Sequence, residues 1–152
     1  MRLKPQLPLR FNTKRLLALF TLFWWGITSS STAAEQLLIF VVHPENPISS
    51  IKVSDLSKIF LKKTTVFKSG QKIIPLDLIP SKVSFYEKFL GKRLDRIQQY
   101  WLKSIFSGRK TPPKEFKKIE GLLIFVRSNL GAIAYLPPDV NIGNLKKIKV
   151  VP

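Results

Sequence analysis

The sequence predicts one α/β domain, a single lobe with a mostly parallel sheet flanked by helices. Apolar, strand-like runs alternate with amphipathic helical segments along the chain, which is the pattern of layered α/β proteins. The chain has 152 residues, enough for one compact core. It has no cysteine, which excludes a disulfide scaffold, a zinc cluster and a thiol nucleophile.

The first predicted elements are a strand at residues 36–42 and a helix at residues 53–61. The run QLLIFVV is apolar throughout and rich in branched residues, as in a strand buried on both faces. Two prolines within residues 43–47 end it. The helix has one apolar face, formed at helical spacing by Leu56, Ile59 and Phe60.

The middle of the chain predicts a strand at residues 72–78 and helices at residues 80–90 and 94–106. Pro75 favours an edge position or a break in the strand. Gly91 and Gly108 are suitable helix terminators. Each helix has an apolar stripe: Phe85, Phe89 and Leu90 in the first, and Ile97, Tyr100, Trp101 and Ile105 in the second.

The last third predicts a helix within residues 115–128 and strands at residues 132–136 and 146–151. The helix is favoured over a strand because a typical helix exit, Ser-Asn-Leu-Gly, follows it. The predicted order is therefore β-α-β-α-α-α-β-β, which places helices between strands of a mostly parallel sheet.

Residues 1–34 have the layout of a secretory signal peptide. Five basic residues and no acidic one precede a 12-residue apolar run, and small residues follow it. The run is shorter than the roughly 20 residues that cross a bilayer. We expect cleavage after Ala34 and no stable membrane span afterwards. The alternative is an uncleaved anchor, for which Trp24 and Trp25 would suit the membrane interface.

The predicted export changes which anionic partners the positive charge of the chain indicates. The whole chain has 26 basic and 9 acidic residues, a formal net charge of +17, which by itself indicates a nucleic acid or another anionic partner. Without residues 1–34, residues 35–152 keep 21 basic residues against 9 acidic, a net +12. In the predicted periplasmic location, the available anions are lipid headgroups, envelope polymers, small oxyanions and acidic proteins, so we expect no nucleic-acid partner.

Four segments together resemble a known family. They are residues 41–51 (VVHPENPISSI), 55–77, 85–113 (with YWLKSIFSGRKTPP at its end) and 129–137 (NLGAIAYLP). In this order and spacing they resemble the phosphate-binding proteins of bacterial ABC importers, within the type II periplasmic binding proteins. The likeness covers about 100 residues, 37–137, and is closest to small exported relatives with one lobe. It implies a non-enzymatic binding protein without a cofactor, with phosphate as ligand and an ABC transporter as partner.

The sequence departs from the family pattern where the family binds phosphate. The family has a Ser-Gly-Thr-type turn at a helix start, preceded by an arginine. Here residues 76–84 read LDLIPSKVS, without the glycine and the arginine. A glycine lets backbone N–H groups approach an anion closely, so the cradle does not carry over residue by residue. Phe67 also replaces a tryptophan, Lys62 replaces a glycine, and the family's second lobe has no counterpart.

Two groups of residues are candidate ligand contacts. Ser81, Lys82 and Ser84 lie at a predicted helix start, where N–H groups and the helix dipole favour an anion. Ser81 could instead serve only as a helix cap. His43, Ser49 and Ser50 follow the first strand, at the sheet edge where open α/β folds bind ligands. His43 could instead make only a structural hydrogen bond. No ligand set for a metal accompanies it.

The remaining polar and aromatic residues suggest no catalysis. Asp55, Asp77, Glu87 and Asp95 show no spacing typical of acid–base pairs, so we expect no enzyme. Helical spacing favours a core position for the aromatic group Tyr100, Trp101 and Phe106, rather than a base-stacking surface. Two functions follow: an exported binding protein for phosphate or another small oxyanion, or an accessory module that contacts an envelope protein or an anionic surface.

Overall fold

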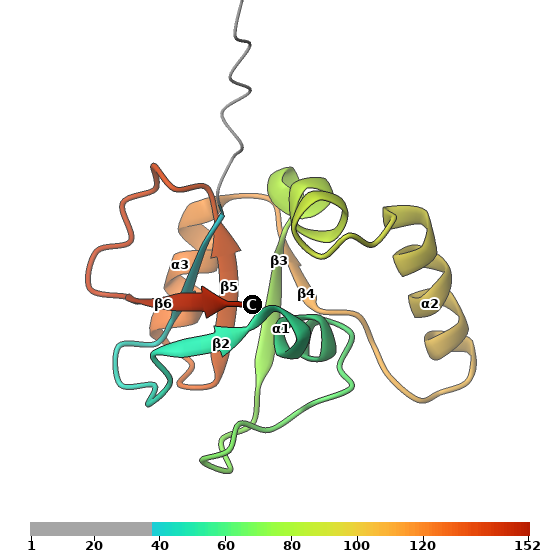
Figure 1. Ribbon diagram of the computed structural model, residues 1–152, viewed down its shortest axis with the longest axis horizontal. Coiled ribbons are helices and arrows are strands. Elements are labelled where there is room, and N and C mark those ends of the chain that lie inside the picture. The colour runs from blue at the N-terminus through green and yellow to red at the C-terminus, as the bar shows by residue number, and fades with distance from the viewer. Residues whose placement is uncertain (1–37) are drawn as a thin grey trace, which may run out of the picture. The chain divides into compact units, whose positions relative to one another are not determined.

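Six strands form one mixed sheet in the order β2-β6-β1-β5-β3-β4. The structure, a computed structural model, describes residues 38–152 (Figure 1). The predicted signal peptide, residues 1–34, lies outside the described residues. The strands are β1 (Ile39–Val42), β2 (Ser50–Lys52), β3 (Ile74–Leu78), β4 (Lys114–Phe116), β5 (Ala132–Leu136) and β6 (Lys146–Val151).

Three α-helices and two short helical segments complete the described part of the chain. They are α1 (Val53–Phe60), the 3₁₀ turn η1 (Ile79–Ser81), the π-helical segment η2 (Ser84–Phe89), α2 (Leu94–Phe106) and α3 (Ile119–Arg127). The predicted helices at residues 53–61 and 94–106 are confirmed, and a helix lies within residues 115–128, although Glu115 and Phe116 belong to the strand β4. The helix predicted at residues 80–90 is present as η1 and η2.

The sheet is parallel in three of its five strand pairings. β2 pairs with β6, and β3 pairs with both β4 and β5, in parallel. β1 is antiparallel to both of its neighbours, β5 and β6. The predicted α/β class with a mostly parallel sheet is therefore confirmed, with one antiparallel strand near its centre.

The two faces of the sheet are covered by different helices. Tyr135 of β5 faces α1 and η2, where its ring stacks on Phe85 and lies near Phe60. Side chains alternate between faces along a strand, so Ala134 and Leu136 point to the other side. There α3 contributes Leu122 and other buried apolar residues to the core. The sheet is thus buried on both faces, as its apolar strands require.

The prediction for Pro75, an edge position or a break in the strand, is met only locally, because β3 itself is not an edge strand. β3 has β5 on one side and β4 on the other. However, β4 pairs with β3 only from Leu76 onward. Ile74 donates its N–H to Gly131 on the β5 side, so the ring nitrogen of Pro75 faces the side where pairing has not begun. The missing donor therefore costs no ladder hydrogen bond.

Gly131 is required by a close approach between two chain segments. A Cβ at this position would lie 1.8 Å from the carbonyl oxygen of Lys72, which is backbone. Gly131→Ala should therefore lower the free energy of unfolding by about 1–3 kcal/mol, because the segments must separate. Denaturant titration measures this change.

Gly121→Ala is the matched control, since a Cβ there meets only the ring of Phe116 at 3.6 Å. Alanine in place of a helical glycine should leave stability unchanged or higher. If the Gly131→Ala and Gly121→Ala proteins unfolded at the same denaturant concentration, the close approach at Lys72 would be wrong.

Candidate functional site

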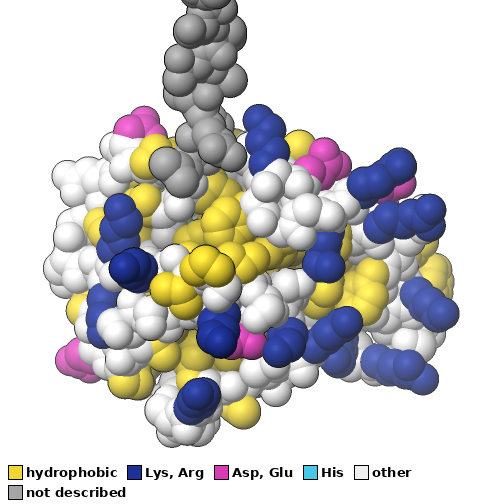
Figure 2. Space-filling view, viewed as in Figure 1, with side chains coloured by type: hydrophobic (Ala, Val, Ile, Leu, Met, Phe, Trp, Pro, Cys, Tyr) yellow, Lys and Arg dark blue, Asp and Glu magenta, His cyan; other side chains and the backbone are white. Residues whose placement is uncertain are grey.

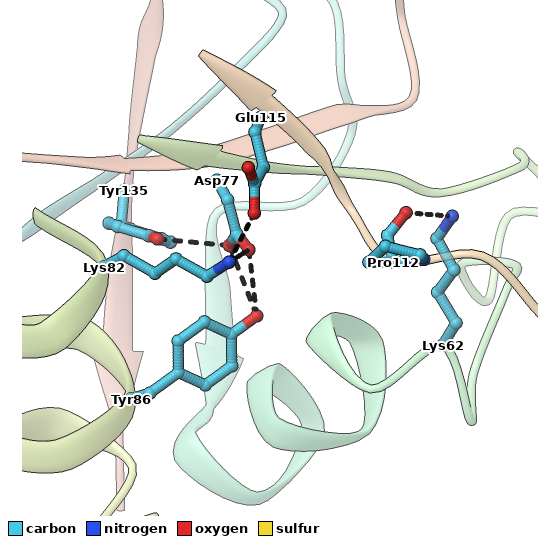
Figure 3. Close-up of polar contacts among 7 residues, drawn as sticks. All are labelled: Lys62, Asp77, Lys82, Tyr86, Pro112, Glu115 and Tyr135. Carbon is cyan, nitrogen blue, oxygen red and sulfur yellow. Dashed lines mark hydrogen bonds and ion pairs between the residues drawn. The ribbon is translucent and has the colours of Figure 1, made fainter. Parts of the chain in front are cut away.

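A buried carboxylate lies where the family resemblance predicts the anion cradle. Asp77, the next-to-last residue of β3, is 1 % exposed. It accepts hydrogen bonds from the hydroxyl of Tyr86 at 3.2 Å and from that of Tyr135 at 3.1 Å (Figure 3). The Lys82 ammonium lies 3.7 Å from the same carboxylate and also pairs with Glu115. We call these five residues the Asp77 cluster.

The sheet register explains the cluster. Asp77 of β3 lies directly opposite Glu115 of β4, so two carboxylates face each other across parallel strands. Like charges in this position are unfavourable. Lys82 follows the end of β3 and places its ammonium between them, as Figure 3 shows. The cation therefore pairs with two carboxylates of its own chain.

Burial has the largest effect on the pKa values of Asp77 and its two tyrosine donors. Desolvation raises the pKa of Asp77 to about 6, although Lys82 and the two tyrosine hydroxyls favour the ionised form. Burial and the neighbouring Asp77 charge also raise the pKa values of Tyr86 and Tyr135. Both tyrosines therefore stay neutral and act as hydrogen-bond donors to the carboxylate.

Packed aromatic rings position the Tyr135 side of the Asp77 cluster. Phe85 is fully buried, and its ring stacks on Tyr135 at 4.1 Å between centroids. Phe60 from α1 lies 4.5 Å from Phe85, and Phe40 from β1 lies 6.0 Å from it. These contacts join η2 to three other elements and hold the Tyr135 hydroxyl toward Asp77.

Ser81, Lys82 and Ser84 lie just after the end of β3, where Lys82 is itself part of the Asp77 cluster. Ser81 is buried in η1, and Ser84 begins η2, which has only six residues. The predicted cation, Lys82, is already paired with carboxylates. An oxyanion approaching here would meet Asp77 and Glu115, which repel it.

His43, Ser49 and Ser50 lie away from Ser81. β1 is antiparallel to β5, and β5 is parallel to β3. His43 follows β1, so it lies at the edge where β3 and β5 begin, whereas Ser81 follows the end of β3. The six predicted contact residues therefore do not form one half-site.

The His43 loop has its own structural contacts. His43 Nδ1 accepts the backbone N–H of Glu45 at 3.1 Å, which is the structural hydrogen bond considered from the sequence. Asn46 is 1 % exposed, and its amide donates to the carbonyl of Leu130 at 2.9 Å. These bonds fix the loop against the start of β5.

Ser50 lines a groove that the sequence did not predict. The groove has a volume of about 560 Å³ and lies between β2, α1 and residues 64–73. Its lining is mostly apolar, and includes Ile51, Ile59 and Phe67. Ser49, next to it, is exposed and uses its carbonyl to accept the N–H of Lys149 at 2.9 Å.

Within residues 38–152, no group of three His, Cys, Asp or Glu side chains is arranged to hold a metal ion. Nor does any helix in this part of the chain have the length and apolar character to cross a membrane.

Comparisons with known proteins agree with this architecture. The sequence matches no family model and no curated protein. Solved structures do match. The chain has the fold of one lobe of a phosphate-binding protein of the ABC importer type. The likeness confirms the fold predicted from the resemblance, and at these identities it concerns the fold alone.

Three structures illustrate the match. A substrate-binding protein of a phosphate ABC transporter from Clostridium perfringens, with bound phosphate, has a TM-score of 0.56 at 15% identity. A phosphate transport receptor from Vibrio cholerae has 0.54 at 18%, and PstS from Borrelia burgdorferi 0.56 at 18%. Each match covers 74% of this chain and 44–46% of the other. The chain therefore spans less than half the length of these proteins.

Four residues of the site were not found from the sequence: the carboxylates Asp77 and Glu115, and the hydroxyl donors Tyr86 and Tyr135. One signal was present, since Asp77 stands inside the apolar run IIPLDL. A carboxylate in such a run is seldom buried without partners. The partners lie 9 and 58 positions further along the chain, so the sequence could not name them.

Proposed function

We propose that the protein is an exported, non-enzymatic accessory lobe, which contacts a component of the cell envelope through its surface and does not close around an oxyanion. Its location is the periplasm, after cleavage of residues 1–34. The fold supports this proposal because the structures it resembles are binding proteins. Proteins of this type close two lobes around a ligand. This chain has the fold of one lobe.

The observation that carries the proposal is the Asp77 cluster. At the end of β3, Lys82 pairs with two carboxylates of the same chain, Asp77 and Glu115. Without them, the Lys82 ammonium would be free to bind an oxyanion. Ser81 is buried, and η2 is too short to present a strong helix dipole. The groups that would hold an oxyanion are thus engaged within the protein.

Oxyanion binding is the competing function. It is supported by the bound phosphate in the Clostridium perfringens protein of similar fold and by the positions of Ser81 and Ser84 near one another. It would require Lys82 to leave Glu115 and turn toward the ligand. This requirement makes the two functions distinguishable by experiment.

Thermal unfolding in phosphate separates them. A ligand at 100 times its dissociation constant adds about 2.7 kcal/mol to stability, which raises the Tm by several degrees. We expect millimolar phosphate or sulfate to leave the Tm of the purified protein unchanged. Stabilisation by phosphate that disappears in a Lys82→Gln variant would overturn the proposal in favour of oxyanion binding.

A further inference from the structure

The C-terminal end of α2 carries exposed apolar side chains. Leu102 is 58 % exposed, Ile105 49 % and Phe106 84 %. Their i, i+3, i+4 spacing places them on one side of the helix. Earlier in the helix, Ile97 and Trp101 pack toward η2 and are buried. The expected core position of Phe106 is therefore wrong, while Tyr100 and Trp101 do pack against the core.

Cations precede and follow this apolar tip in the sequence, and two of them, Arg109 and Lys110, line one cavity with Ile105. Residues 96–114 contain five basic residues and no acidic one: Arg96, Lys103, Arg109, Lys110 and Lys114. None of the five forms an ion pair with a carboxylate within the described part of the chain. Figure 2 shows Lys and Arg side chains gathered on the side of the molecule where α2 lies. The tip thus combines exposed apolar side chains with neighbouring cations.

A lysine-lined cavity adjoins the tip. It has a volume of about 370 Å³, and Lys62, Lys72 and Thr111 are among its lining residues. Thr111 also lines a second cavity of about 320 Å³, with Ile105, Arg109 and Lys110. Because they share Thr111, the two cavities lie side by side along one segment.

Hydrogen bonds hold this arrangement. The Lys62 ammonium donates to the carbonyl of Pro112 at 3.1 Å (Figure 3), and the Lys110 ammonium donates to the carbonyl of Lys62 at 2.7 Å. Burial and the nearby charge of Lys72 lower the pKa of Lys62. Two lysines thus lie close enough to repel, with no carboxylate paired to either among residues 38–152. An external anion would relieve that repulsion.

We infer that this end of the lobe, which we call the α2 tip, binds the surface of an anionic phospholipid bilayer. The tip comprises Leu102, Ile105, Phe106, Arg109 and Lys110, with Lys62 and Lys72 beside it. The lysines and arginine contact lipid phosphates, and the three apolar side chains enter the headgroup boundary. This inference rests on the proposed function and names the envelope component that the lobe contacts.

The combination of side chains favours a bilayer over other anions. Free phosphate would use the lysines but leave Phe106 and Leu102 in water. A single-stranded nucleic acid would use the cations and Phe106, but would leave the aliphatic Leu102 and Ile105 without a role. A bilayer accepts all of these groups at once and needs no shaped pocket.

Vesicle co-sedimentation of the full chain tests the inference. We expect stronger binding to phosphatidylcholine vesicles containing phosphatidylglycerol than to phosphatidylcholine alone, and loss of this difference in high salt. The double variant Ile105→Ser/Phe106→Ser and the double variant Lys62→Gln/Lys72→Gln should each weaken binding about tenfold. Lys147→Gln/Lys149→Gln, on exposed positions of β6, is the matched control and should change binding less than about twofold.

Hydrogen exchange of the same protein locates the contact. Every variant retains residues 1–37, so any vesicle binding by that segment is the same in all of them. Protection of the peptide covering residues 102–113 therefore reports contact at the α2 tip itself. Protection by phosphatidylglycerol vesicles supports the inference. Equal loss of vesicle binding in the β6 control, absence of protection, or protection by inorganic phosphate alone would overturn it.

The outcomes also separate this inference from the proposed function. Vesicle binding without protection of residues 102–113 would refute the α2 tip as the lipid-binding surface. Thermal unfolding in phosphate would still decide whether the lobe is an oxyanion receptor. Conversely, phosphate stabilisation through Lys82 refutes the accessory role even when vesicles bind.

Discussion

Phe85→Ala should lower the free energy of unfolding by about 3–5 kcal/mol, the largest effect of any substitution considered. Phe85 is fully buried and its ring contacts the rings of Tyr135, Phe60 and Phe40, so alanine leaves a cavity that four elements surround. Equilibrium denaturation, followed by tryptophan fluorescence and circular dichroism, measures the loss.

The companion variant Phe85→Leu separates volume from aromatic contact. Leucine fills most of the space, so it should cost clearly less than alanine. A loss below about 1 kcal/mol for Phe85→Ala would mean that η2 does not pack on β5 as described.

Asp77→Asn should change how stability depends on pH. The pKa of Asp77 rises from its ordinary value of 3.8 to about 6 in the folded protein, chiefly because of burial. Between these values the folded protein binds the proton more tightly than the unfolded chain does. The contribution of Asp77 to stability is therefore full below pH 4 and lost as pH rises through 6. Relative to Asp77→Asn, the wild type should gain about 2 kcal/mol between pH 7 and pH 4.

Denaturant titrations at several pH values measure this difference directly. Asp139→Asn, at an exposed position, is the control and should run parallel to the wild type. If the wild type instead lost stability relative to Asp77→Asn as pH fell, the ion pair with Lys82 would outweigh burial, and the account of the Asp77 cluster would be wrong.

The sequence predicted the long elements but not the two shortest strands. The strands β1, β3, β5 and β6 and the three α-helices have clear apolar patterns, and their positions were predicted to within a few residues. β2 and β4 have three residues each, SIK and KEF, and lie at the two edges of the sheet. Three partly exposed residues carry no periodicity, and only pairing with a distant strand makes them β-structure.

Strand direction decided which candidate residues could meet. His43 and Ser81 could lie at one sheet edge only if β1 and β3 ran in the same direction. β1 is antiparallel to its neighbours, which puts the two residues at opposite edges. An apolar run such as IFVV reports burial on both faces but not the direction of the neighbouring strand.

The α2 tip shows a second limit of pattern reasoning. Helical spacing correctly identified Ile97 and Trp101 as core residues, and it also aligned Ile105 with them. Ile105 and Phe106 lie in the last turn, beyond the surface that η2 covers, so nothing in the described part of the chain buries them. Periodicity gives the side of a helix but not the length over which a partner covers it.

The central claim is that the lobe neutralises its own anion cradle, and isothermal titration of phosphate tests it most directly. The wild type should give no saturable heat, whereas Asp77→Asn/Glu115→Gln, in which Lys82 has lost both carboxylate partners, should bind phosphate measurably. Saturable phosphate binding by the wild type that Lys82→Gln abolishes would contradict the claim, and would make the protein an oxyanion receptor built on a single lobe.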